Sequence, residues 1–120
     1  MSDRSLKILV VEDHGDTSRV MARLLQSHGH DVHVAEGVQS ALAVAEIEPI
    51  DLVISDIGLP DGNGNDLMRQ IQAIRPTRGI ALSGYGSSDD VRQAKAAGFA
   101  IHVTKPVDFS KLKTLIDQLG

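Results

Sequence analysis

Short apolar runs alternate along the chain with segments of helical hydrophobic spacing. The runs are rich in Val and Ile and cover Leu6–Val11, Val32–Ala35, Leu52–Ser55, Ile80–Ser83 and Ile101–Thr104. Runs of this length without polar alternation are typical of strands that are buried on both faces, as in a parallel sheet. We therefore predict five such strands.

The segments between these runs carry apolar residues three and four positions apart, which predicts an amphipathic helix after each strand. The expected buried stripes are Val20, Leu24 and Leu25; Val38, Ala41, Leu42 and Ala45; Leu67, Ile71 and Ile74; and Leu112, Leu115, Ile116 and Leu119. The expected helix ends are Gly29, Pro49, Pro76 and Gly98, and the expected caps are the Ser87–Asp90 pair and Asp108.

Five strand–helix units in strict alternation predict an α/β fold with a doubly wound parallel sheet and right-handed crossovers. No repeat, low-complexity tract or linker interrupts the 120 residues, so we expect a single domain over residues 1–120 with a core at about 7–119 and no output domain. In such sheets, ligands bind beyond the carboxyl ends of the strands. We therefore look for functional residues at the carboxyl ends of the strands.

The composition excludes several classes of function. Sixteen acidic side chains against twelve basic ones give a formal net charge of −4, so the chain has no basic excess for a nucleic-acid backbone. It contains no apolar run of about 18 residues that would span a membrane, and no cysteine for disulfides or nucleophilic catalysis. We expect a small acidic domain in the cytoplasm that does not insert into membranes.

Polar side chains stand where the predicted strands end. They are Glu12 and Asp13 after the first strand, Asp56 after the third, Ser83 at the end of the fourth and Lys105 after the fifth. Because the carboxyl ends of parallel strands share one edge of the sheet, we expect these residues to converge on one site.

The chemistry of that set points to a phosphoryl group. Carboxylates held close together repel unless a cation joins them, and Mg²⁺ prefers a few carboxylates together with phosphate oxygens. Lys105 would add positive charge for a phosphoryl group, and Ser83 would donate a hydrogen bond to it. One of the carboxylates would then serve as the nucleophile and form an acyl phosphate.

The set Glu12-Asp13, Asp56, Ser83 and Lys105-Pro106 resembles the receiver domain of two-component response regulators. The likeness covers nearly the whole chain, from about Lys7 to Leu119, and the segment Ile54–Gly62 is similar to the family's phosphoacceptor segment. The resemblance implies a flavodoxin-like (βα)5 sheet with strand order 2-1-3-4-5. It also implies a binding module that turns over no separate substrate and catalyses only its own phosphorylation and dephosphorylation.

The resemblance assigns roles to single residues. Asp56 would take a phosphoryl group from the phosphohistidine of a histidine kinase or a histidine phosphotransfer protein. Asp13, Asp56 and the carbonyl of Gly58 would ligate Mg²⁺, with Glu12 reaching the metal through water. Ser83 and Lys105 would hold the phosphoryl oxygens, and the Lys105–Pro106 bond would be cis. The switched surface would then contact a downstream protein.

Three positions depart from the commonest family pattern. Gly58 stands where many relatives carry a side chain that influences dephosphorylation, and Ser83 replaces the more usual Thr. His102 stands where a Tyr or Phe usually rotates as the hydroxyl residue moves, so Ser83 and His102 are the candidate switch residues. The runs Ala81–Gly86 and Thr104–Val107 are similar to receivers of hybrid histidine kinases, which would place the chain at the cytoplasmic face of the membrane.

The residues argue against two other functions and leave a third open. A haloacid-dehalogenase-like phosphatase needs a second acid two residues after its nucleophile, where this chain has Gly58. A flavodoxin-like electron carrier needs a hydroxyl-rich loop after the first strand, where this chain is acidic. A degenerate receiver that acts only as an interaction module stays open, although every expected residue type of the site is present.

Two further segments invite a metal interpretation. The loop Asp61–Asp66 lacks the Gly and Glu that an EF-hand needs, so we predict a flexible turn that caps the third helix. His14, His28, His30 and His33 lie near one another in the sequence, but the last three straddle a helix end and the next strand. We do not expect these histidines to form a metal site.

Overall fold

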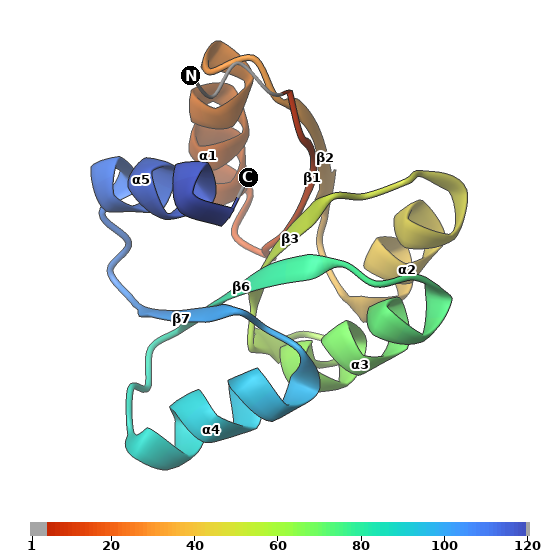
Figure 1. Cartoon of the computed structure of the whole chain (residues 1–120), viewed down its shortest axis with the longest axis vertical. Coiled ribbons are helices and arrows are strands. Elements are labelled where there is room, and N and C mark those ends of the chain that lie inside the picture. The colour runs from red at the N-terminus through yellow and green to blue at the C-terminus, as the bar shows by residue number, and fades with distance from the viewer. Residues whose placement is uncertain (1–4, 120) are drawn as a thin grey trace.

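The computed structural model describes residues 5–119 and contains a five-stranded parallel sheet between two layers of helices (Figure 1). The sheet strands are β1 (Lys7–Val11), β2 (Asp31–Ala35), β3 (Leu52–Asp56), β6 (Arg78–Ser83) and β7 (Ile101–Thr104). Their order is β2-β1-β3-β6-β7, which confirms the predicted order 2-1-3-4-5 when only these strands are numbered. The predicted domain range also included residues 1–4 and 120, which lie outside the described residues.

The helices are α1 (Gly15–Ser27), α2 (Val38–Ile47), α3 (Gly64–Ile74), α4 (Ser88–Ala97) and α5 (Phe109–Leu119). In Figure 1, α1 and α5 lie on one face of the sheet, and α2, α3 and α4 lie on the other. Successive side chains of a strand point to opposite faces, so Ile8 and Val10 pack under α1 and α5 while Leu9 and Val11 pack under the other three helices. The two hydrophobic cores explain why the central strands β1, β3 and β6 are buried on both faces. The prediction was wrong for the edge strands β2 and β7, which are only partly buried because each has a neighbouring strand on one side alone.

The predicted helical stripes are confirmed except at two positions. The buried residues of α1 are Ser18, Met21, Ala22 and Leu25. Val20 is 53% exposed, because a helix turns by about 100° per residue and Val20 therefore lies opposite Ala22. Ile74, the last residue of α3, is 42% exposed, and Met68 in the middle of the helix is buried instead. The predictions for Val20 and Ile74 were wrong.

The predicted caps of the last two helices are confirmed. The Ser87 hydroxyl accepts a hydrogen bond from the backbone N–H of Asp90 (3.1 Å), and the Asp90 carboxylate accepts one from the N–H of Ser87 (3.2 Å). Gly98 ends α4 with a φ of 113°, which favours glycine. The Asp108 carboxylate accepts the N–H of Ser110 at 3.0 Å at the start of α5.

The loop after β3 forms a small hairpin that the sequence did not predict. Its strands are β4 (Gly58–Leu59) and β5 (Gly62–Asn63). The predicted cap of α3 is confirmed, because the Asn63 side chain accepts the N–H of Asn65 at 2.7 Å. The hairpin also caps α2: the Asp61 carboxylate accepts the N–H groups of Val38 (2.7 Å) and Gln39 (3.1 Å).

The link from Asp61 to α2 predicts a pH dependence. The N–H groups of Val38 and then Gln39 hold the pKa of Asp61 below its ordinary value of 3.8. An acid whose pKa is depressed by folding stabilises the fold above its unfolded pKa and loses this contribution as the pH falls through its folded pKa. We therefore expect Asp61→Asn to lower the thermal midpoint by several degrees at pH 7 and by less below about pH 4.

Thermal melts of both proteins between pH 7 and pH 3 measure this difference. Asp117→Asn removes a carboxylate from the exposed surface of α5, where its partner is the Lys113 ammonium at 3.6 Å, and serves as the control. If the thermal midpoint of Asp61→Asn lies below that of the wild type by the same amount over the whole pH range, the role of the Asp61 charge is contradicted.

Candidate functional site

The carboxyl ends of three strands bring Glu12, Asp56 and Lys105 into one cluster. The Lys105 Nζ atom lies 2.5 Å from Asp56 Oδ1 and 3.4 Å from Glu12 Oε1. The side chains of Glu12 and Asp56 are 2% and 6% exposed, whereas that of Lys105 is one-third exposed. Three of the predicted site residues thus meet, with the ammonium group on the open side.

The electrostatics of the cluster favour an additional cation. Burial raises the pKa of Glu12, and the nearby Asp56 carboxyl raises it further against the opposing charge of Lys105. Burial lowers the pKa of Lys105, but its contacts with Asp56 and Glu12 outweigh this effect and leave that pKa above 10.5. Two buried carboxylates therefore share one ammonium.

The acidic residues fit a hard divalent cation. Glu12 Oε2 is a buried oxygen without a hydrogen bond, and Asp56 Oδ1 has only its ion pair with Lys105. Asp13 lies next to Glu12 and is partly exposed, as expected of a group at the mouth of the site. Carboxylate and carbonyl oxygens with room for water are what Mg²⁺ prefers.

Backbone hydrogen bonds hold the neighbouring strand ends together. The N–H of Ile57 donates to the carbonyl of Leu82 (3.0 Å), and the N–H of Lys105 donates to the carbonyl of Ser83 (2.7 Å). Ser83 is itself buried, and its hydroxyl accepts the N–H of Tyr85 at 3.0 Å. Ser83 therefore stands at the same edge of the sheet as the acidic cluster.

The remaining predicted residues lie on β7, on β4 and directly after β7. His102 is half-buried on β7, and its Nε2 atom is buried without a hydrogen bond. Gly58 is exposed in β4, and a Cβ atom there would have no atom within 4 Å. The Lys105–Pro106 peptide bond is cis, as the resemblance implied.

The sequence prediction set His14 aside as a metal ligand and overlooked Gly64. His14 follows the acidic pair directly, and Glu12, Asp13 and His14 each offer a ligand atom within 4.8 Å of the other two. Gly64 begins α3 so close to β3 that a Cβ atom would lie 2.1 Å from the Asp56 carbonyl oxygen. The adjacency of His14 to the acids was a visible signal, whereas the contact of Gly64 depends on tertiary packing.

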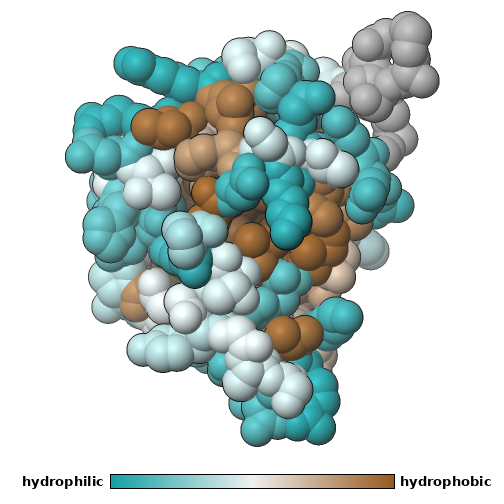
Figure 2. All heavy atoms as spheres, turned by 90° about the vertical axis from the view of Figure 1, so that its left-hand side faces the viewer, coloured by the Kyte–Doolittle hydropathy of each residue, from teal (hydrophilic) through white to brown (hydrophobic). Residues whose placement is uncertain are grey.

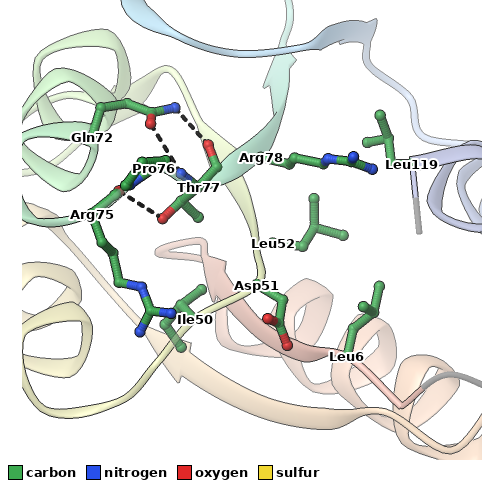
Figure 3. A pocket seen from close by; sticks show the side chains of 10 residues that line it. All are labelled: Leu6, Ile50, Asp51, Leu52, Gln72, Arg75, Pro76, Thr77, Arg78 and Leu119. Atoms are coloured by element: carbon green, nitrogen blue, oxygen red, sulfur yellow. Dashed lines mark hydrogen bonds between the residues drawn. The ribbon is translucent and has the colours of Figure 1, made fainter.

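Two cavities lie at opposite edges of the sheet. A cavity of about 330 Å³ adjoins the cluster, and Glu12, His14 and Lys105 line it together with apolar residues of α1 and α5. Figure 2 views the side on which α5 lies in Figure 1, where hydrophobic surface is broken up by hydrophilic side chains. The other cavity, of about 440 Å³, lies where the strands begin, and Figure 3 shows Arg75 and Arg78 on two of its sides. It contains none of the predicted site residues.

Comparison with known proteins identifies the family. The family model described as the response regulator receiver domain matches residues 8–117. The chain belongs to this receiver family. The receiver domain is a signalling module of two-component systems, so the predicted function is confirmed at this level.

Individual relatives agree with this assignment. The receiver is 37% identical to the response regulator protein PilR of Pseudomonas aeruginosa, over 92% of this chain and 25% of PilR. It is 33% identical to the sensory/regulatory protein RpfC of Xanthomonas campestris, over 95% of this chain and 16% of RpfC. The chain thus spans a quarter or less of the length of these two relatives.

Solved receivers share the fold. A Burkholderia pseudomallei response regulator, solved with a phosphorylated aspartic acid, a calcium ion and citrate, superposes with a TM-score of 0.85 at 25% identity, over 92% of this receiver and 65% of that chain. Receiver domains bind Mg²⁺ at an acidic pocket and interact with histidine kinases or phosphotransfer proteins. None of the described helices of this receiver is long and apolar enough to cross a membrane.

Proposed function

We propose that this receiver accepts a phosphoryl group on Asp56 and thereby switches a protein-docking surface. The observation that carries the proposal is the buried Asp56 carboxylate with the Lys105 ammonium at 2.5 Å, at the carboxyl edge of the sheet. Its neighbours Glu12 and Lys105 line a cavity of about 330 Å³, through which a phosphoryl donor could approach. The donor would be the phosphohistidine of a histidine kinase or a histidine phosphotransfer protein.

The transfer is a substitution at phosphorus. A carboxylate oxygen of Asp56 attacks the phosphorus atom, the phosphorus–nitrogen bond of the phosphohistidine breaks, and the imidazole leaves with the bonding electron pair. The product is an acyl phosphate on Asp56. Lys105 pairs with the negative oxygens of the transferred group, and the Ser83 hydroxyl donates to one of them, so this chain contributes positioning and charge.

Mg²⁺ would be held by Asp13, Asp56 and the backbone carbonyl of Gly58, with Glu12 acting through water. When bound, this ion neutralises negative charge on the phosphoryl oxygens and the carboxylates. The unpartnered oxygen of Glu12 and its raised pKa support a cation at this place. A structure of the Burkholderia relative holds a phosphorylated aspartic acid and a calcium ion, which is in keeping with a receiver that carries a phosphoryl group in the presence of a divalent cation.

The switch would start at Ser83. Its hydroxyl now accepts the N–H of Tyr85, and turning toward a phosphoryl group on Asp56 would break that hydrogen bond and shift the loop before α4. His102 would follow, since its buried Nε2 has no hydrogen bond to hold it. The altered surface of α4, β7 and α5 would contact a downstream protein in the cytoplasm, without direct contact to nucleic acid.

A haloacid-dehalogenase-like phosphatase differs from the proposed function because it turns over a separate substrate. Such a phosphatase needs a second acid two residues beyond its nucleophile, and Gly58 provides no side chain there. We therefore propose that the chain catalyses only its own phosphorylation and dephosphorylation and is not an enzyme with a separate substrate.

Incubation with acetyl phosphate and Mg²⁺ tests the proposal. We expect the intact mass to rise by one phosphoryl group and the amide resonances of Ser83, α4, β7 and α5 to shift, since both follow from an acyl phosphate at Asp56. Removal of Mg²⁺ with a chelator should prevent labelling. An unlabelled protein would contradict the acceptor role, and labelling without amide shifts would contradict the switch.

A further inference from the structure

A histidine side chain stands beside the acidic pair at the end of β1. His14 Nδ1 lies 3.6 Å from Asp13 Oδ1 and 3.9 Å from Glu12 Oε2. Two ligand atoms bound tetrahedrally to one Zn²⁺ ion at 2.0–2.2 Å lie about 3.3 to 3.6 Å apart. Both distances to His14 are therefore close to those of ligands that share an ion.

The buried oxygen of Glu12 points to a ligand independently of this spacing. Glu12 is 2% exposed, and its two oxygens face different groups: Oε1 lies 3.4 Å from Lys105 Nζ, and Oε2 faces His14. Only Oε2 is without a hydrogen bond. A buried carboxylate oxygen is costly unless it is paired, and a cation between Oε2 and His14 would pair it.

Ions can reach this place from solution. Glu12 and His14 both line the 330 Å³ cavity beside α1. The His14 side chain is 76% exposed and makes no capping hydrogen bond at the start of α1. Its ring lies beside the carboxylates of Asp13 and Glu12, so a metal held by the same three groups would take the place of these contacts.

We propose that Glu12, Asp13 and His14 bind Zn²⁺ or a similar late first-row divalent cation, in competition with Mg²⁺. Imidazole suits Zn²⁺ and its neighbours, whereas Mg²⁺ prefers oxygen ligands and retains water. The competition rests on the proposed function, because it assumes that Asp13 and Glu12 also serve Mg²⁺. The Zn²⁺ site itself stands on the three residues of β1 and α1.

Calorimetric titration of the unphosphorylated protein tests this site. We expect His14→Gln to weaken Zn²⁺ binding by about tenfold or more, since even residues that merely orient a metal ligand have effects of this size. The affinity for Mg²⁺ should change by less than about twofold, because an imidazole contributes little to a Mg²⁺ site. His28→Gln replaces the exposed histidine at the other end of α1 and is the matched control.

Two results would overturn the proposal: an unchanged Zn²⁺ affinity in His14→Gln, or an equal loss of Zn²⁺ and Mg²⁺ affinity. Circular dichroism of both variants verifies their folding. Asp13→Asn should lower the affinity for both Zn²⁺ and Mg²⁺ and tests the same site without changing the histidine. Acetyl phosphate labelling of the wild-type chain is read separately. Its failure would count against the phosphoacceptor proposal and leave the Zn²⁺ titration standing.

Discussion

Asp56→Asn is expected to reduce phosphoryl incorporation from acetyl phosphate to background. The Asn amide is no nucleophile and cannot form the acyl phosphate. The fold should persist, because the substitution keeps the size of a buried side chain and removes one of two neighbouring negative charges. Intact-mass spectrometry of the labelled protein measures the effect.

The matched control for this variant is Asp61→Asn, which removes a carboxylate five residues further along the same segment. Asp61 caps α2 and lies outside the cluster, so its variant should still take up one phosphoryl group per chain. A second readout concerns Glu12, whose pKa is raised partly by Asp56. That pKa should fall in Asp56→Asn, and wild-type labelling of this variant would disprove the acceptor assignment.

Gly64→Ala is expected to have the second largest effect. A Cβ atom on Gly64 would lie 2.1 Å from the Asp56 carbonyl oxygen and 2.9 Å from Ile57 Cα, both of them backbone atoms. Either α3 or the end of β3 must move, and forced overpacking of this kind costs about 1–3 kcal/mol. We expect the free energy of unfolding to fall by about this amount and labelling at Asp56 to slow, because the acceptor is displaced from Lys105.

Gly15→Ala is the matched control for the glycine substitution. Gly15 begins α1 as Gly64 begins α3, but a Cβ atom there would have no atom within 4 Å. Alanine is favoured over glycine in a helix, so this variant should be as stable as the wild type or slightly more stable. Urea denaturation compares the two variants, and equal stabilities would refute the steric role of Gly64.

Much of the fold was predictable because the central strands are buried on both faces. Uninterrupted apolar runs such as Leu52–Ser55 identify such strands, and Gly98 and Pro76 mark helix ends by local backbone chemistry. The error at Val20 has a physical cause: three apolar residues of α1 are compatible with two helical faces, and only packing against the sheet selects the one with Met21 and Leu25.

The candidate site was predictable to the extent that it depends on strand ends. Glu12, Asp56 and Lys105 meet because the topology fixes where their strands terminate. The cap that Asp61 forms on α2 joins residues more than twenty positions apart, and no local pattern encodes it. The clearance between Gly64 and the Asp56 carbonyl likewise exists only in the packed protein.

The hairpin that follows the acceptor is held both at its turn and at its base. Asp61 ties its turn to α2, and the N–H of Gly64 donates to the carbonyl of Ile57 at 2.7 Å. By contrast, Ser83 is held through its hydroxyl by a single N–H in a loop with glycines on both sides of Tyr85. If Asp56 is phosphorylated as proposed, we therefore expect the resulting movement to pass through β6 and β7, whereas the hairpin and α2 on the other side should stay in place.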